Sequence, residues 1–236
     1  MKKMVLSILI ISTLSIGVHA QTAEEYSLAG MTKYFSEDFK GAIADFSKAI
    51  ELNLEVASVY FFRGAAKSAL KDHQAAILDF DKVIELKPEH DDAYYIRGKV
   101  KSFIEDFRGA MLDLNKAIEL NPKHPEAYYV RGMVKSLLQD YRGSILDFSK
   151  AIDINPDNIE AYQDRGMSKF ILKDYRGAIL DFDKVIEQKA EYGAMYFFRG
   201  SSKLMLDRID SGCLDLSKAG ELGYVEAYEA IRNYCN

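Results

Sequence analysis

Three kinds of charged residue recur along this sequence with a spacing of 34 residues, and they carry its most distinctive chemistry. They suggest either internal ion pairs or a row of cations that binds an anionic ligand. A matching aspartate in every period favours ion pairs, because a half-buried charge needs a partner. The sequence leaves open whether Arg97 pairs with Asp113 of its own period or with Asp79 of the preceding one. The three series are Arg63, Arg97, Arg131, Arg165 and Arg199; Lys33, Lys67, Lys101, Lys135, Lys169 and Lys203; and Asp45, Asp79, Asp113, Asp147, Asp181 and Asp215.

Each period divides into two helices. In residues 91–124, Tyr94 and Gly98 lie on one helical face, and Leu114 belongs to a second, later face. Residues 105–109 form a predicted polar break between the two helices, and Pro122 ends the second one. The pattern therefore predicts a helix–turn–helix hairpin that repeats along the chain as a solenoid.

The repeated unit resembles the tetratricopeptide repeat family over residues 23 to 222. The resemblance implies an all-α fold, a right-handed α-solenoid of antiparallel helix hairpins. The shortened last connection is similar to the tighter turns of Sel1-like repeats. The residues that carry the resemblance are Tyr94, Gly98, Ala110, Leu114, Ala117 and Pro122. The expected organisation is a signal peptide at 1–20 and a repeat domain at 21–236, with units at about 23–56, 57–90, 91–124, 125–158, 159–192 and 193–224 and a capping helix at 225–236.

One face of each first helix varies between units, whereas the face that holds Tyr94 is nearly constant. In the family, this variable face lines a concave groove. Aromatic and methionine side chains there suit an extended or helical peptide. The alternative is plain packing between neighbouring first helices. The candidate groove residues are Phe61, Tyr95, Lys99, Tyr129, Met133, Gln163, Met167 and Phe197.

Acidic residues stand at the start of successive first helices, at Asp92, Glu126 and Glu160. Helix N-termini favour negative charge, so capping explains them. The alternative is a site for a basic ligand.

The first twenty residues predict export. Lys2 and Lys3 precede an apolar run, and small residues before Gln21 indicate cleavage between Ala20 and Gln21. An uncleaved anchor is the alternative, although the run is short for a bilayer. Cleavage leaves 29 basic and 36 acidic residues without a basic block, which argues against nucleic acid. The expected location is the periplasm or the extracellular space, with no membrane span after cleavage.

Cys213 and Cys235 are the only cysteines. Export places them in an oxidising compartment, and the start of one helix lies beside the end of the next in an antiparallel pair. We therefore expect a disulfide between them, with two free thiols as the alternative.

Motifs for catalysis are missing from the sequence. His73, His90 and His124 fall in turns or at unit ends without ligand-spaced partners, so we expect no metal and no cofactor. The sequence therefore favours a non-catalytic, protein- or peptide-binding scaffold in the bacterial cell envelope over an enzyme that uses the groove. A chaperone-like or enzyme-regulating subunit of an envelope complex is the alternative. The sequence names neither the partner nor the oligomeric state.

Overall fold

A computed structural model describes residues 21–235, and these residues form thirteen α-helices. The first twelve helices pair into six antiparallel hairpins, and the thirteenth packs on the last hairpin. The all-α solenoid expected from the sequence is therefore confirmed. The helices are α1 (Ala23–Phe35), α2 (Phe39–Glu51), α3 (Ala57–Ala69), α4 (His73–Leu86), α5 (Asp91–Phe103), α6 (Phe107–Leu120), α7 (Pro125–Leu137), α8 (Tyr141–Ile154), α9 (Ile159–Ile171), α10 (Tyr175–Gln188), α11 (Gly193–Leu204), α12 (Ile209–Glu221) and α13 (Glu226–Tyr234).

The turn inside each hairpin is shorter than the polar break expected from the sequence. Glu105 adopts a left-handed backbone conformation with φ of 61°, and Asp106 then caps the next helix. The Asp106 carboxylate accepts a hydrogen bond from the Gly109 amide at 2.9 Å. Because this cap satisfies a free amide of the first turn, α6 begins at Phe107, and residues 107–109 are helical.

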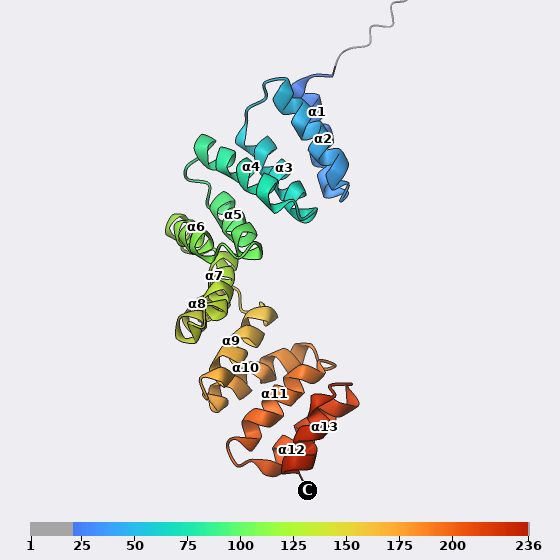
Figure 1. Cartoon of the computed structure of the whole chain (residues 1–236), viewed down its shortest axis with the longest axis vertical. Helices are drawn as coiled ribbons and strands as arrows, with labels where there is room; N and C mark the ends of the chain where they lie inside the picture. Colours follow the sequence, from blue (N-terminus) through green and yellow to red (C-terminus); the bar gives the residue numbers. More distant parts are fainter. Residues whose placement is uncertain (1–20, 236) are drawn as a thin grey trace, which may run out of the picture.

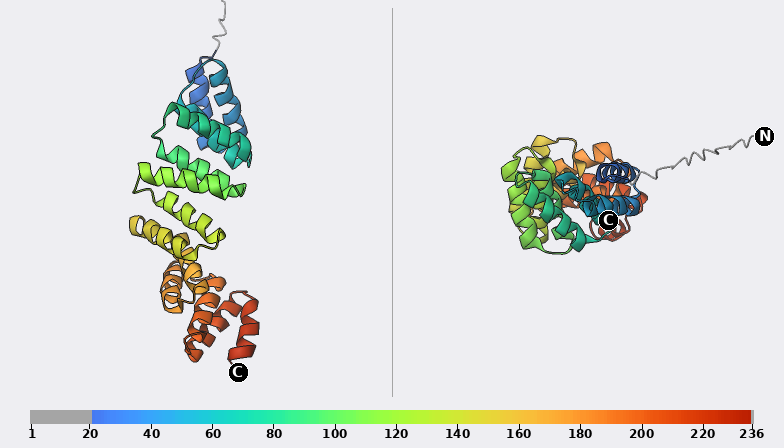
Figure 2. Two further views of the ribbon diagram at one scale, coloured as in Figure 1. Left: turned by 60° about the vertical axis from the view of Figure 1, so that its left-hand side comes forward. Right: turned by 90° about the horizontal axis from the view of Figure 1, so that it is seen from above.

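The stack of hairpins is curved, with the first helix of every hairpin on the inner side. Each odd-numbered helix contacts the next odd-numbered helix, whereas no two even-numbered helices touch within residues 21–235. Figure 1 shows the hairpins following one another along the long axis. Seen from above in Figure 2, the middle hairpins, drawn in green, are displaced to one side of the blue and red ends. The inner helices therefore line the concave side of a superhelix.

Small residues allow the two helices of a hairpin to approach closely. A Cβ atom on Gly98 would lie 3.2 Å from the carbonyl oxygen of Ala110 and 3.0 Å from Cγ of Leu114. Leu114 is fully buried, as are the phenylalanines at the equivalent positions of most other units. This packing outweighs the roughly 1 kcal/mol that glycine costs a helix relative to alanine.

Helices long and apolar enough to cross a membrane do not occur between residues 21 and 235. The expected signal peptide, including Ala20, lies outside the described residues. Gln21 is the first described residue, and Thr22 caps α1.

Candidate functional site

The arginine series belongs to the scaffold and not to the groove. Each arginine forms a two-point contact with the aspartate of its own hairpin: in Arg131, Nε lies 2.8 Å from Oδ2 of Asp147 and Nη2 lies 2.6 Å from Oδ1. Lys135 contacts the same carboxylate at 2.7 Å. Both cations are at least four-fifths covered, so the structure supports the ion-pair interpretation over a row of ligand-binding cations. The pairing within the hairpin also decides the question that the sequence left open.

A third contact of each arginine joins neighbouring hairpins. Nη1 of Arg131 donates to the Asn115 side chain of the preceding hairpin at 2.7 Å. Each guanidinium also lies 5.3–5.6 Å from the centroid of a tyrosine ring on its own helix. Burial acts to lower the pKa of Arg199, but hydrogen bonds to Asp215 and Asp183 outweigh it and raise the pKa above its ordinary value. The series therefore holds the inner helices in a fixed relation. The acceptors in the preceding hairpins are Ser47, Asp81, Asn115, Ser149 and Asp183.

The aromatic groove candidates are half-buried, because each packs across a joint between hairpins. Phe61 stacks on His90, with ring centroids 5.1 Å apart. Tyr95 lies on His124 at 4.6 Å, and burial raises the pKa of Tyr95 to about 12, with Glu126 and Asp92 adding to the effect. These residues therefore serve hairpin packing and present only part of their surface to the groove.

Three recesses open between the inner helices. The N-terminal recess, of about 300 Å³, lies between α3 and α5 and includes Tyr95 and Lys99 in its lining. The middle recess, of about 210 Å³, lies between α7 and α9. The C-terminal recess, of about 390 Å³, lies beside α11 and includes Phe197. The middle recess is lined by Met133, Ser136, Leu137, Phe148, Asp164 and Met167.

Five of the eight expected groove residues thus line these recesses, and three do not. Phe61, Tyr129 and Gln163 line none of the three recesses. Lys99 and Met133 are the most accessible of the set, since both are exposed. The recesses follow the inner surface from hairpin to hairpin, so they could receive successive side chains of one extended segment.

Asp164 lines the middle recess, and it is not among the groove residues expected from the sequence. Its Oδ2 accepts a hydrogen bond from the Tyr129 hydroxyl at 2.9 Å, and Oδ1 lies 3.5 Å from the Gln163 amide nitrogen. Burial raises the pKa of Asp164, and these hydrogen bonds offset only part of the effect. Comparison of the units at this position would have found it, because the other units carry Leu28, Phe62, Ile96, Val130 and Phe198 there.

The acidic residues at the helix starts lie in the first turns of α5, α7 and α9, as capping predicts. Asp92 and Glu126 also flank the buried His124, at 3.3 Å from Nε2 and 3.1 Å from Nδ1. Glu160 pairs with Lys189 at 2.8 Å, and this hydrogen bond lowers the pKa of Glu160. More than half of each of these three side chains is exposed, so Asp92 and Glu126 present their charge to solvent, whereas Lys189 offsets the charge of Glu160.

His90, Asp91 and Asp92 offer ligand atoms within 4.8 Å of one another. We assign no metal site to them, because Asp92 lies beside His124 and the other two residues also have partners of their own. His90 stacks on Phe61, and the Asp91 carboxylate accepts a hydrogen bond from Asn121 at 2.7 Å.

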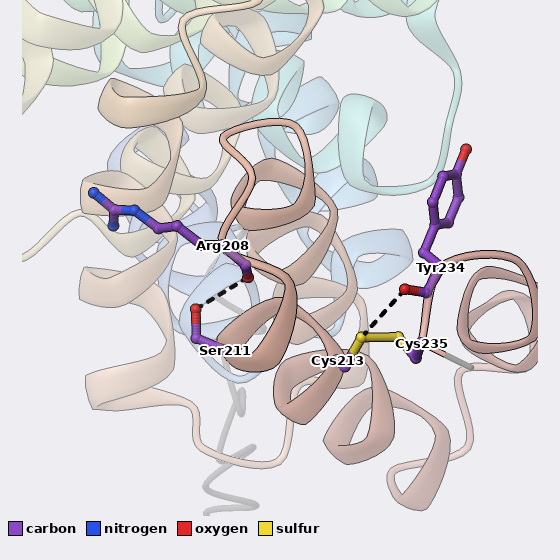
Figure 3. Close-up of a disulfide and its surroundings, with 5 residues drawn as sticks. All are labelled: Arg208, Ser211, Cys213, Tyr234 and Cys235. Atoms are coloured by element: carbon purple, nitrogen blue, oxygen red, sulfur yellow. Dashed lines mark hydrogen bonds between the residues drawn. A yellow bond between two sulfur atoms is a disulfide. The ribbon is translucent and has the colours of Figure 1, made fainter.

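A disulfide joins Cys213 in α12 to Cys235 at the end of α13, as expected from the sequence (Figure 3). The two Cα atoms are 5.7 Å apart. The Cys213 sulfur also lies 3.9 Å from the carbonyl oxygen of Tyr234. Because Ala230 and Tyr234 help to line the C-terminal recess, the disulfide fastens one wall of that recess.

Comparison with known proteins places these repeats among characterised folds. A family model described as tetratricopeptide repeat matches residues 57–90, 91–124 and 125–158. MamA protein, whose crystal structure is known, is 28% identical to this chain in sequence. The two structures align with a TM-score of 0.65, and the alignment covers 72% of this chain and 94% of that one. No curated protein matches this chain significantly in sequence.

Two further solved structures share the fold at lower identity. YrrB, a repeat protein described as having an unusual peptide-binding site, is 24% identical with a TM-score of 0.71, covering 79% of this chain and 97% of its own. The C-terminal part of a repeat-containing protein from Cytophaga hutchinsonii is 17% identical with a TM-score of 0.76, covering 87% of this chain and 86% of its own.

Proposed function

Since the chain is a tetratricopeptide-repeat protein, and this fold is typically a non-catalytic scaffold for protein interactions, we propose that its inner groove binds a protein or peptide segment. The observation that supports this proposal is that scaffold positions and groove positions differ in how much they vary between units. The charged series and the hairpin cores repeat from unit to unit, whereas the residues that line the recesses change. When groove residues differ between units on a constant scaffold, each unit can bind a different side chain of one partner.

Groove-dependent capture of a partner tests this proposal. Mature protein is immobilised, exposed to envelope extract, and compared with the double variant Lys99→Glu, Met133→Lys. Both side chains are exposed in the groove, so the double variant should fold normally and lose the captured partner. Leu146→Lys is the matched control, because Leu146 is 71% exposed on α8, outside the groove. Loss of capture in the control, or retention in the double variant, would place binding elsewhere.

We also propose that the protein acts after export, in the periplasm or outside the cell, within the bacterial envelope. The basic and apolar start of the sequence supports this, as does the pair of cysteines. Removal of residues 1–20 would leave α1 whole, since it begins at Ala23 with Thr22 as its cap. N-terminal sequencing of the protein from an envelope fraction should read Gln21 first, and a retained Met1 would contradict export by cleavage.

A further inference from the structure

Asp164 stands apart from the other acidic residues of the hairpin interior. The five aspartates from Asp79 to Asp215 each face an arginine and a lysine at ion-pair distance. Within residues 21–235, Asp164 forms no ion pair. The nearby lysines are engaged elsewhere: Lys135 on α7 pairs with Asp147, and Lys169 on α9, the helix of Asp164 itself, pairs with Asp181. The carboxylate therefore stays uncompensated.

The scaffold does not need a carboxylate at this position. Val130 and Phe198, at the same place in the neighbouring hairpins, pack against apolar side chains of the core. A carboxylate covered by apolar side chains destabilises the folded state unless it is paired. Its hydrogen bond with Tyr129 supplies a partner for one oxygen without neutralising the charge. A polar residue that lines a recess, at a position where the other repeats carry apolar residues, is a candidate for ligand binding.

The surroundings of Asp164 match a long side chain that ends in a positive charge. Met133, Leu137 and Met167 supply apolar walls, and methionine adapts its shape to what it contacts. Oδ1 of Asp164 keeps acceptor capacity, since its only hydrogen bond within residues 21–235 is the weak one with Gln163. Lysine and arginine combine an apolar stem with a charged head, so both parts would find a complementary surface. Glu160, on the same helix, is close enough for its charge to raise the pKa of Asp164, although it also pairs with Lys189.

We propose that the middle recess binds the cationic side chain of a lysine or arginine residue in the segment that the groove holds, with Asp164 pairing with the cation and Met133 and Met167 packing on the stem. This rests on the proposed function, because it gives one position of the bound segment its chemistry. It also predicts that partners carry a basic residue at the position that faces α9.

The first experiment uses small probes, so it needs no knowledge of the partner. N-acetyl-lysine methylamide is titrated into mature protein with ¹³C-labelled methionine methyl groups, and N-acetyl-norleucine methylamide, which has the same stem without the amine, serves as the uncharged analogue. The lysine probe should shift the Met133 and Met167 resonances and bind at least about tenfold more tightly than the norleucine probe. Asp164→Asn should remove this advantage. Asp153→Asn, an exposed change on α8, should preserve it. Equal binding of the two probes, or no effect of Asp164→Asn, would overturn the proposal.

A second experiment separates this inference from the proposed function. Pools of nine-residue peptides carry lysine, arginine or norleucine at the central position and random residues elsewhere. Preferential capture of the basic pools by wild type, but not by Asp164→Asn, supports the inference. Equal capture of all pools, lost in the Lys99→Glu, Met133→Lys variant, would leave the groove function standing and refute the role of Asp164. Binding of the lysine probe without capture of any pool or protein would support the recess and refute the larger groove.

Discussion

The guanidinium of Arg131 and the carboxylate of Asp147 meet through two parallel hydrogen bonds that join the helices of one hairpin, α7 and α8. This geometry is the strong form of an ion pair, because both oxygens are engaged by a rigid donor. The remaining Nη1 reaches the preceding hairpin through Asn115. The Arg131 side chain therefore helps to fix both the angle between the two helices of its hairpin and the position of that hairpin against the preceding one.

Replacing Arg131 with leucine should destabilise the middle of the array by several kcal/mol, towards the lower end of the roughly 3–5 kcal/mol typical of breaking a buried pair. Lys135 would remain beside Asp147 and limit the loss. The measurement is the urea midpoint followed by circular dichroism. Arg142→Leu is the matched control, because Arg142 is exposed on α8 of the same hairpin. Equal midpoints for the two variants would mean that the buried pair contributes little.

Replacing Asp164 with asparagine should stabilise the protein at neutral pH. The pKa of Asp164 is raised by burial, so the folded state binds this proton more readily than the unfolded state does. Wild-type stability should therefore fall relative to the variant as pH rises from about 4, near the ordinary aspartate value, through the raised pKa. Urea midpoints of both proteins across that range give the test. A constant difference would show that Asp164 titrates alike in both states. Asp153→Asn, at an exposed position, should show no such trend.

Replacing Tyr129 with phenylalanine should raise the pKa of Asp164 further. The Tyr129 hydroxyl donates to this carboxylate and so favours its charged form. Carbon NMR of the aspartate side chains follows the titration directly. Tyr128→Phe provides the control, since Tyr128 is the adjacent residue and its ring lies against Arg131 instead. A shift of the same size in both variants would rule out the hydrogen bond as the cause.

Removing the disulfide by Cys213→Ser should loosen the C-terminal end without unfolding the rest. The bond spans 22 residues, and closing such a loop contributes about 3 kcal/mol on the chain-entropy model. The terminal helix has a neighbour on one side only, so protease should release it from the variant first. Mass spectrometry of the early fragments reads this out. In wild type, alkylation of both thiols without reductant would contradict the bond.

The repeating features of this protein could be predicted well, because the residues at equivalent positions of the units can be compared directly in the sequence. The sequence indicated that Arg97 pairs with an aspartate, yet both Asp79 and Asp113 satisfied the spacing. Their choice depends on the crossing of the helices within a hairpin, which sets the distance between side chains. The link from Arg97 to Asp81 was missed because that column changes from serine to aspartate to asparagine. What the column preserves is an oxygen acceptor.

The candidate site was harder to predict for a related reason. Tyr95 was identified as a groove residue, but its packing on His124 depends on where the next hairpin begins. Asp164 was overlooked because the comparison of units followed the adjacent face of the helix. The adjacent face varies throughout, whereas the face of Asp164 is apolar in every unit except one. A single departure from an apolar column was the stronger signal of chemistry.

The arginine joint has a further consequence for how such an array can change in length. The donor is the same in five hairpins, and the preceding hairpin needs to supply only a hydroxyl, an amide or a carboxylate oxygen at one position. Duplication or deletion of a 34-residue block would bring together two surfaces that already fit. Each event would add or remove one inner helix together with its lining residues. An ancestral protein could in this way have gained hairpins one at a time. The groove residues of each new hairpin could then have changed to suit a partner, while the arginine contacts between hairpins stayed the same.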